Sequence, residues 1–150
     1  MFIYRPDSQN AGYWLQNEKP YTFHERDIED IHFSPVDSNE LASCSADGTL
    51  RLCDLRENNY RKAHTTILAH DADVNVFSWN KKVPTLLVTG SDDGSFKVWD
   101  KRFLETSISD VIWHNEPITS IQFQPNEEST VAVSSADNRL TIWDFSVEPN

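Results

Sequence analysis

Short apolar stretches of five or six residues recur three times along the chain in the same order. Several carry apolar side chains on both faces, as strands packed between two neighbouring sheets must. Clusters of Ser, Ala, Asp and Gly or Asn separate the second stretch of each set from the third, which is typical of a tight hairpin. The pattern predicts strands at Ile28–Phe33, Leu41–Ser45, Thr49–Cys53, Val74–Trp79, Leu86–Ser91, Ser95–Trp99, Ile118–Phe123, Val131–Ser135 and Arg139–Trp143, and fourth strands at Ala63–Leu68 and Ser109–Trp113.

Each set begins with a histidine and ends in a recurring phrase. His24, His70 and His114 start the three copies, 46 and 44 residues apart. In every copy a turn aspartate follows the histidine by 23 residues, and a Trp or Cys follows it by 29. The copies end in SADGTLRLCD, SDDGSFKVWD and SADNRLTIWD. This spacing and phrase resemble the WD repeat, whose period is about 40–45 residues.

The resemblance implies an all-β fold, a partial β-propeller with three four-stranded blades plus part of a preceding blade. Residues 24–69, 70–113 and 114–150 are the expected WD repeats, the last one lacking its outer strand. A propeller needs roughly 4–8 blades to close, so three copies are expected to be part of a ring.

Residues 1–23 are expected to be the end of the preceding blade and its connecting strand. Phe2–Tyr4 is predicted to end a third strand, and Pro6–Asn17, with its Asp, Ser, Asn and Gly, is predicted to be a loop. Pro20–Phe23 is predicted to be the fourth strand leading to His24.

Composition and charge limit the classes of function that the chain can have. The 38% hydrophobic and 11% aromatic content suits a folded β protein. No apolar run approaches the ~20 residues of a membrane span, and no secretory signal is visible. The net charge of −11 comes mainly from residues 25–56 and 103–150. An acidic surface repels nucleic-acid phosphates and attracts basic polypeptides. The alternative interpretation is that the negative charge serves only to keep the protein soluble.

The sequence predicts no metal or cofactor. Cys44 and Cys53 are expected to be buried free thiols rather than a disulfide, and no CxxC spacing points to zinc. The five histidines lack ligand spacing, and no glycine-rich phosphate loop is present.

Some residues imitate catalytic groups: His24 with Ser43 and Asp47 has the composition of a Ser-His-Asp triad. In WD repeats, which the chain resembles, these positions form a buried network of turn aspartate, histidine, strand hydroxyl and indole. Three copies of a triad in one chain would be strange, so we predict that the protein is not an enzyme. The proposed network residues are His24, Ser43, Asp47, His70, Thr89, Asp93, Trp99, His114, Asp137 and Trp143.

The three copies are unequally complete. Cys53 replaces Trp in the first copy, and Val133 replaces the hydroxyl in the third, so His114 is expected to lose its bridge to Trp143. His70→Ala or Asp93→Ala is therefore expected to destabilise the fold more than the matching changes in the third copy.

Two features indicate partner binding. Trp99-Asp100-Lys101-Arg102 resembles the Trp-Asp-x-Arg pattern of WD proteins that dock on cullin-4 ligase adaptors, although an ordinary surface arginine also fits. Carboxylates follow each repeat histidine, where an acidic rim can hold a Lys/Arg-rich segment or merely be solvated. The expected partner-binding residues are Glu25, Asp27, Asp71, Asp73, Glu116, Asp100 and Arg102.

A narrower resemblance suggests which WD proteins are related. Ile28–Pro35, Ala42–Asp47 and Ala69–Val76 resemble the C-terminal half of the glutamate-rich WD-repeat proteins, and more distantly the histone-binding, retinoblastoma-binding WD proteins. The resemblance implies a nuclear or nucleolar ribosome-biogenesis factor, a chaperone for a basic large-subunit ribosomal protein of the L-three family. Its partners would include pre-ribosomal assembly factors, with no direct nucleic-acid or membrane binding.

A histone-binding chromatin subunit and a cullin-4 substrate receptor are the alternatives. The chain lacks the glutamate-rich tract and the N-terminal blades of that family.

Overall fold

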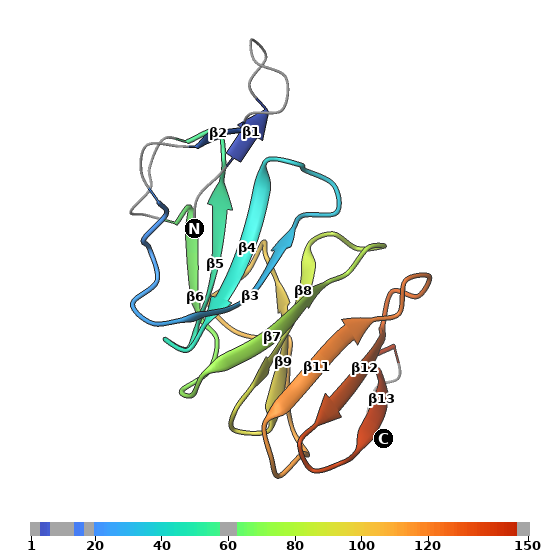
Figure 1. Ribbon diagram of the computed structural model, residues 1–150. Coiled ribbons are helices and arrows are strands. Elements are labelled where there is room, and N and C mark those ends of the chain that lie inside the picture. Colours follow the sequence, from blue (N-terminus) through green and yellow to red (C-terminus); the bar gives the residue numbers. More distant parts are fainter. Residues whose placement is uncertain (1–3, 7–13, 17–19, 58–62, 147–150) are drawn as a thin grey trace.

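The computed structural model describes residues 4–6, 14–16, 20–57 and 63–146, which form strands, turns and loops (Figure 1). The predicted all-β class is confirmed. Among the described residues there is no helix that could cross a membrane. The strands are β1 (Tyr4–Pro6), β2 (Trp14–Gln16), β3 (Ile28–Phe33), β4 (Glu40–Ser45), β5 (Thr49–Asp54), β6 (Thr65–Leu68), β7 (Val74–Trp79), β8 (Leu86–Ser91), β9 (Ser95–Asp100), β10 (Ser109–Ile112), β11 (Ile118–Phe123), β12 (Thr130–Ser135) and β13 (Leu140–Asp144).

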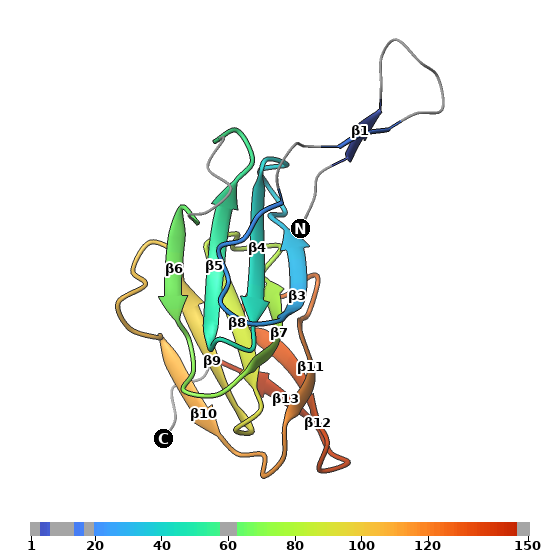
Figure 2. The same cartoon turned by 60° about the vertical axis from the view of Figure 1, so that its left-hand side comes forward.

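These strands make three antiparallel meanders and one small hairpin. The meanders run β3-β4-β5-β6, β7-β8-β9-β10 and β11-β12-β13, and β1 pairs with β2. We call the meanders blades one, two and three. They fan out side by side, each turning a face to the next blade along the chain (Figures 1 and 2).

The nine strands predicted within the repeats are present to within one residue at either end. The two outer strands are shorter than predicted, because β6 begins at Thr65 rather than Ala63 and β10 ends at Ile112 rather than Trp113. Ala63 is instead buried in a small hydrophobic cluster, and the Trp113 ring packs on His114 with centroids 4.9 Å apart.

The hairpin between the second and third strands of each blade is tight because one turn residue has positive φ. This residue is Gly48 or Gly94 at 79° in the first two blades and Asn138 at 64° in the third. Glycine adopts this conformation freely, and asparagine tolerates it. A Cβ on Gly48 would lie 2.6 Å from the carbonyl oxygen of His70, so glycine also lets the next repeat histidine approach the turn.

The segment before His24 differs from the prediction. Trp14–Gln16 is not loop but β2, paired with β1. Pro20–Phe23 is not a strand, and the backbone carbonyl of Phe23 accepts a hydrogen bond from the Arg51 guanidinium. Phe2 and Ile3 lie outside the described residues.

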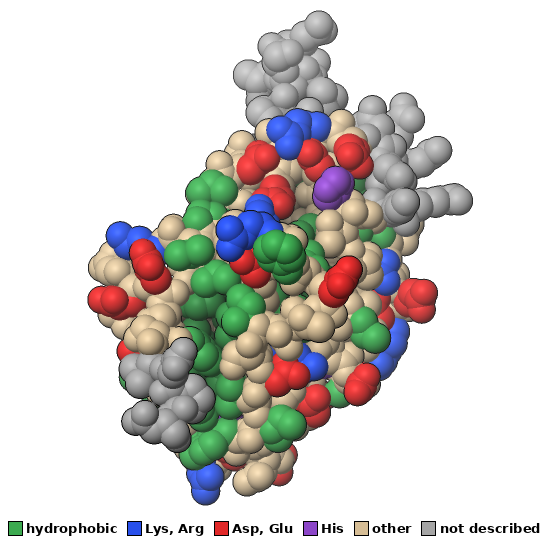
Figure 3. Space-filling view, turned by 180° about the vertical axis from the view of Figure 1, so that it is seen from behind, with side chains coloured by type: hydrophobic (Ala, Val, Ile, Leu, Met, Phe, Trp, Pro, Cys, Tyr) green, Lys and Arg blue, Asp and Glu red, His purple; other side chains and the backbone are tan. Residues whose placement is uncertain are grey.

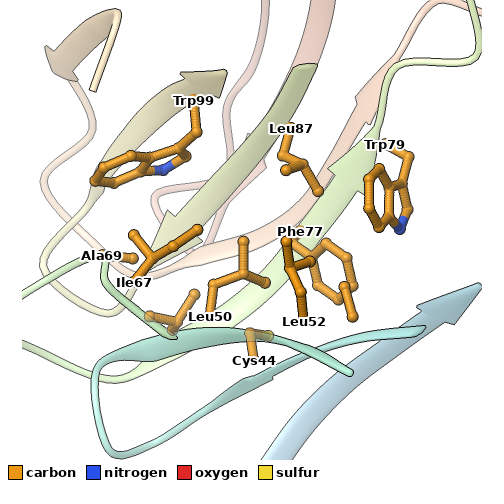
Figure 4. Close-up of a cluster of buried hydrophobic side chains, with 11 residues drawn as sticks. Cys44, Leu50, Leu52, Ile67, Ala69, Phe77, Trp79, Leu87 and Trp99 are labelled. Carbon is orange, nitrogen blue, oxygen red and sulfur yellow. The ribbon is translucent and has the colours of Figure 1, made fainter. Parts of the chain in front are cut away.

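The hydrophobic core lies between blades. Figure 4 shows the cluster between blades one and two, where Leu50 and Leu52 of β5 meet Phe77 of β7 and Leu87 of β8. A second cluster joins blades two and three. Blade two thus contributes both of its faces to the core, which explains why its strands are apolar on both sides.

Candidate functional site

Each repeat histidine has both ring nitrogens bonded, as the first copy shows. His24 Nδ1 lies 3.0 Å from Asp47 Oδ2, and His24 Nε2 lies 2.8 Å from Ser43 Oγ. Because a carboxylate only accepts, we assign the proton to Nδ1, and Nε2 then accepts from the Ser43 hydroxyl. Asp47 also accepts from the backbone N–H groups of Glu25 and Thr49, each at 3.0 Å. The turn aspartate therefore ties the hairpin to the loop after the histidine.

Burial and hydrogen bonding fix the charge states of this pair. Burial by itself raises the pKa of Asp47, but hydrogen bonds from Thr49, the Glu25 N–H and His24 outweigh it and hold that pKa well below its usual range. Burial lowers the pKa of His24 against the opposing effect of Asp47. An ionised aspartate and a neutral histidine result at neutral pH.

The second copy bonds its histidine differently. His70 Nε2 lies 2.9 Å from Thr89 Oγ1, which also accepts from Trp99 Nε1 at 3.0 Å. His70 Nδ1 lies 3.0 Å from Ser95 Oγ but 3.8 Å from Asp93 Oδ2, so the direct hydrogen bond expected between Asp93 and His70 is not formed. Asp93 accepts instead from the Ser95 N–H at 2.8 Å. Burial lowers the pKa of His70 to about 4, opposed by the charge of Asp93.

The third copy keeps its bridge, contrary to the prediction. His114 Nδ1 lies 2.8 Å from Asp137 Oδ2, and His114 Nε2 lies 3.0 Å from Thr141 Oγ1. Thr141 Oγ1 also accepts from Trp143 Nε1 at 2.8 Å. The hydroxyl that Val133 lacks is therefore supplied by another residue of the same blade.

Strand register explains this substitution. Val133 on β12 pairs directly with Thr141 on β13, just as Thr89 pairs with Lys97 and Ser43 with Arg51. Cross-strand partners have neighbouring Cβ atoms, so a hydroxyl moved to the opposite strand still reaches the histidine. A hydroxyl at the cross-strand position was the signal in the sequence that the prediction missed.

Burial shows what these networks do chemically. Ser43 is 3% exposed and Thr89 is fully buried, so neither hydroxyl is open to a substrate. A nucleophile must reach its substrate, whereas a buried polar group needs only its partners. The geometry thus supports the structural interpretation of the proposed network residues.

Cys53 stands where the other two copies have Trp, and larger neighbours accompany it. Cys53 packs in a buried cluster with Tyr21, Phe23 and Ala63. Tyr21 and Phe23 precede His24 by three and one residues, as Ile67 and Ala69 precede His70. Big side chains in the connecting segment thus fill the space that a small residue leaves on β5.

Both cysteines are free thiols, as predicted, in the structure. Burial raises the pKa of Cys53 to about 11 and raises that of Cys44 further. The reactive thiolate is therefore disfavoured at both.

The acidic residues after the histidines are brought together in part. Glu25, Asp71 and Asp73 line a hollow of about 220 Å³ between the loops of the first two repeats, together with Asp47 and Arg26. Arg26 bonds Asp73 at 3.0 Å and the carbonyl of Ala46 at 2.7 Å. Asp47 is nearly buried and is paired with His24 and Arg51, so Glu25, Asp71 and Asp73 are the carboxylates that accompany the Arg26 guanidinium, and the hollow is negative.

Asp27 and Glu116 do not line this hollow. Both are exposed, and their backbone carbonyls accept hydrogen bonds from Ala46 N–H at 3.0 Å and Ser135 Oγ at 2.8 Å. The structure thus separates these two residues from the other acidic candidates.

Asp100 and Arg102 lie next to a different hollow. Asp100 Oδ1 accepts from both the backbone N–H and Nε of Arg102 at 2.9 Å, and this pairing lowers the pKa of Asp100. The Arg102 side chain is 63% exposed and borders an open hollow of about 640 Å³ with Phe103 and Thr66. Asp54 and Arg56 repeat the same pairing, with distances of 2.8 and 2.9 Å.

An ion pair between blades one and two was not predicted from the sequence. Lys101 Nζ of blade two lies 2.9 Å from Glu40 Oε2 of blade one, beside a hollow of about 250 Å³ that Asp37 and Arg56 also line. Sequence spacing does not reveal a pair 61 residues apart. Among the described residues, no cluster of His, Cys, Asp or Glu is placed to hold a metal ion.

Stacked antiparallel blades, with tight turns and buried histidine networks, define a segment of a WD-repeat propeller. The family model described as "WD domain, G-beta repeat" matches residues 16–54, 61–100 and 106–144, so the chain belongs to the WD-repeat family. The expectation that the protein is not an enzyme agrees with this membership.

Curated relatives include one with a ribosomal role in its name. The chain is 43% identical over 97% of its length to "Ribosome assembly protein rrb1" of Schizosaccharomyces pombe, and 40% identical over 92% to "Protein HEAT STRESS TOLERANT DWD 1" of Arabidopsis thaliana. It is 30% identical over 81% to "Protein transport protein sec31" of Emericella nidulans. The chain spans 32%, 30% and 10% of the lengths of these relatives.

Proposed function

We propose that the chain belongs to a nuclear or nucleolar ribosome-assembly scaffold that binds a basic client, a large-subunit ribosomal protein of the L-three family. The observation that carries the client chemistry is the acidic hollow between the first two repeats. Glu25, Asp71 and Asp73 line it with the guanidinium of Arg26, while Asp47 at its edge is paired with His24 and Arg51. The relationship to a protein named for ribosome assembly supports the pathway.

Charge makes the binding mode testable. Residues at the rim of the hollow act on a basic segment through long-range attraction, which accelerates association and weakens with salt. Arg26 opposes this attraction, while Asp71 contributes to it. Changes at the two residues are therefore expected to move affinity in opposite directions.

The direct test uses fluorescence anisotropy with a labelled Lys/Arg-rich peptide from an L-three ribosomal protein. Asp71→Asn should weaken binding and Arg26→Gln should strengthen it, each by up to about fivefold, the scale of an exposed charge pair. Glu105→Gln is the matched control, because Glu105 is exposed but lies beside Arg102 at the other hollow. Equal affinities in all four proteins would mean that the acidic loops only confer solubility.

The same assay distinguishes a ribosomal client from a histone client. A core-histone tail peptide of equal charge is the competitor, and tighter binding of the histone peptide would favour a chromatin subunit. Purification of pre-ribosomal factors with the chain from cells would support the ribosomal role.

Docking on a cullin-4 adaptor is a second candidate, favoured by the exposed guanidinium that Asp100 holds in place. Arg102→Ala should abolish adaptor binding in a pull-down, while Arg56→Ala should not, because Arg56 makes the same local pairing in a copy that lacks the tryptophan. Retained binding in Arg102→Ala would exclude this function.

A further inference from the structure

Most basic side chains on the face shown in Figure 3 lie beside acidic ones, so the charges on that face are largely paired. Two ion pairs join blade one to blade two. Lys101 Nζ bonds Glu40, and it also lies 5.6 Å from the ring centre of the buried Trp79. Arg26 bonds Asp73 at 3.0 Å, but 61% of the Arg26 side chain is exposed. The Arg26 pair is therefore the more easily separated of the two.

The acidic hollow between the first two repeats thus contains a guanidinium of the chain itself. Arg26 Nη1 donates to the Ala46 carbonyl at 2.7 Å and to Asp73 Oδ1 at 3.0 Å. Ala46 belongs to the hairpin turn of blade one, and Asp73 belongs to the loop that precedes β7 of blade two. One backbone carbonyl and one carboxylate, from two different blades, therefore form an acceptor pair that a guanidinium fits.

The joint between blades two and three shows that stacking does not require this ion pair. Ala72 of the second repeat holds the position of Arg26, and Pro117 of the third holds that of Asp73. Neither residue can form an ion pair, yet blades two and three share a buried cluster as blades one and two do. The turn glycine also meets the carbonyl of the next repeat histidine at both joints. The Arg26 pair is therefore free to serve another role.

Two further carboxylates of the hollow are available to a ligand. Glu25 and Asp71 are exposed and line the hollow beside Arg26. Among the described residues, neither carboxylate has a hydrogen bond or an ion pair. A guanidinium from a client that took the two acceptors of Arg26 would still have N–H groups for these carboxylates, because it carries five donors in a planar fork. A lysine ammonium offers three donors at one point, so it satisfies fewer of these acceptors.

We propose that Arg26 is an internal competitor, which holds the place of a client arginine and moves aside when the client binds. The hollow then selects arginine over lysine. This inference rests on the proposed function, because it concerns the client that the acidic hollow binds. Long-range attraction acts alike on arginine and lysine, whereas the acceptors that Arg26 holds distinguish the two side chains.

The test compares two synthetic basic peptides that are identical except that every arginine of one is a lysine in the other. Because their charges are equal, long-range attraction cancels in the ratio of their affinities. In fluorescence anisotropy, Arg26→Gln should strengthen binding of the arginine peptide by about fivefold and of the lysine peptide by no more than about twofold, the range of one exposed charged contact. Adding Asp73→Asn to Arg26→Gln should remove this difference between the peptides.

Arg56→Gln is the matched control. Arg56 is 60% exposed and pairs with Asp54 within blade one, so this variant has the net charge of Arg26→Gln while the acidic hollow is unaltered. It should leave the ratio of the two affinities unchanged. Urea unfolding gives a second readout. Arg26→Gln should unfold at the same urea concentration as the unaltered chain, because blades two and three stack without such a pair.

The possible failures can be told apart. An equal gain of affinity for both peptides in Arg26→Gln would overturn the internal competitor and leave a hollow that binds any basic client. A clearly lower urea midpoint in Arg26→Gln would also overturn it, because the pair would then be a structural clip. If Asp71→Asn weakens neither peptide, the hollow does not bind the client, and both the proposed function and this inference fail.

Discussion

Thr141 and His114 lie 3.0 Å apart, hydroxyl to Nε2, and this contact completes the third repeat network from the opposite strand. The residue at the usual position is Val133, which has no hydroxyl and is fully buried. The repeat therefore preserves a hydrogen-bonded bridge rather than a particular residue.

Removing the Thr141 hydroxyl should be costly unless it is returned across the strand pair. Thr141→Val leaves the Trp143 indole and His114 Nε2 without their shared partner, which should lower the free energy of unfolding by about 1–3 kcal/mol. The double variant Thr141→Val with Val133→Thr should recover most of this loss. Urea unfolding measures both, and Thr119→Val, on the exposed side of β11, is the control. A double variant no more stable than the single one would contradict the exchange.

The second prediction revises the order of importance of the histidines. The sequence alone predicts that His70→Ala costs more than His114→Ala, because the third network looked broken. Since Thr141 completes it and both histidines are 3% exposed, the two losses should agree within about 1 kcal/mol. Thermal melts of the two variants measure this, and a clearly smaller loss for His114→Ala would restore the original order.

The third prediction concerns acid. The pKa of His70 is about 4 in the folded protein, below its ordinary value of 6.5, so the unfolded chain binds more protons between these values. Stability is therefore fully present above pH 6.5 and is lost as the pH falls toward 4, by on the order of 3 kcal/mol for this group. The carboxylates with lowered pKa, such as Asp93, act only at still lower pH.

Urea titrations across this range check the effect. His70→Gln should reduce the dependence on pH and leave the smaller part that comes from the lowered pKa of His24, although the variant is less stable overall. His64→Gln is the control because the His64 side chain is 65% exposed. An unchanged slope in His70→Gln would show that another group titrates.

The fourth prediction tests the cluster around Cys53. Cys53→Trp restores the usual residue of the repeat, yet it should destabilise the protein by about 1–3 kcal/mol, because Tyr21 and Phe23 already fill the space. Adding Phe23→Ala, which copies Ala69 of the next repeat, should relieve much of this cost. Differential scanning calorimetry gives the order, and a stabilising Cys53→Trp would refute the compensation.

Much of the fold was predictable because repetition supplies the long-range information that a single pattern lacks. Three in-phase copies of the His-to-Asp spacing predicted strands such as β3, β7 and β11 with correct bounds. Prediction failed in the segment before His24, where no second copy of β1 and β2 is available for comparison. It also failed at Thr141. The prediction looked for the hydroxyl on the strand before the turn, but a hydroxyl on the strand after the turn reaches the histidine equally well.

The sequence by itself determined the three repeats and the order of their strands, because these follow from hydrophobic period, turn residues and spacing. Tertiary structure decided which residue completes each network, since a hydroxyl on either of two paired strands reaches the same imidazole. It also decided that Glu25 and Asp71 share one hollow while Glu116 lies elsewhere. Such neighbours are set by the stacking of one blade on the next, which spacing along the chain does not encode.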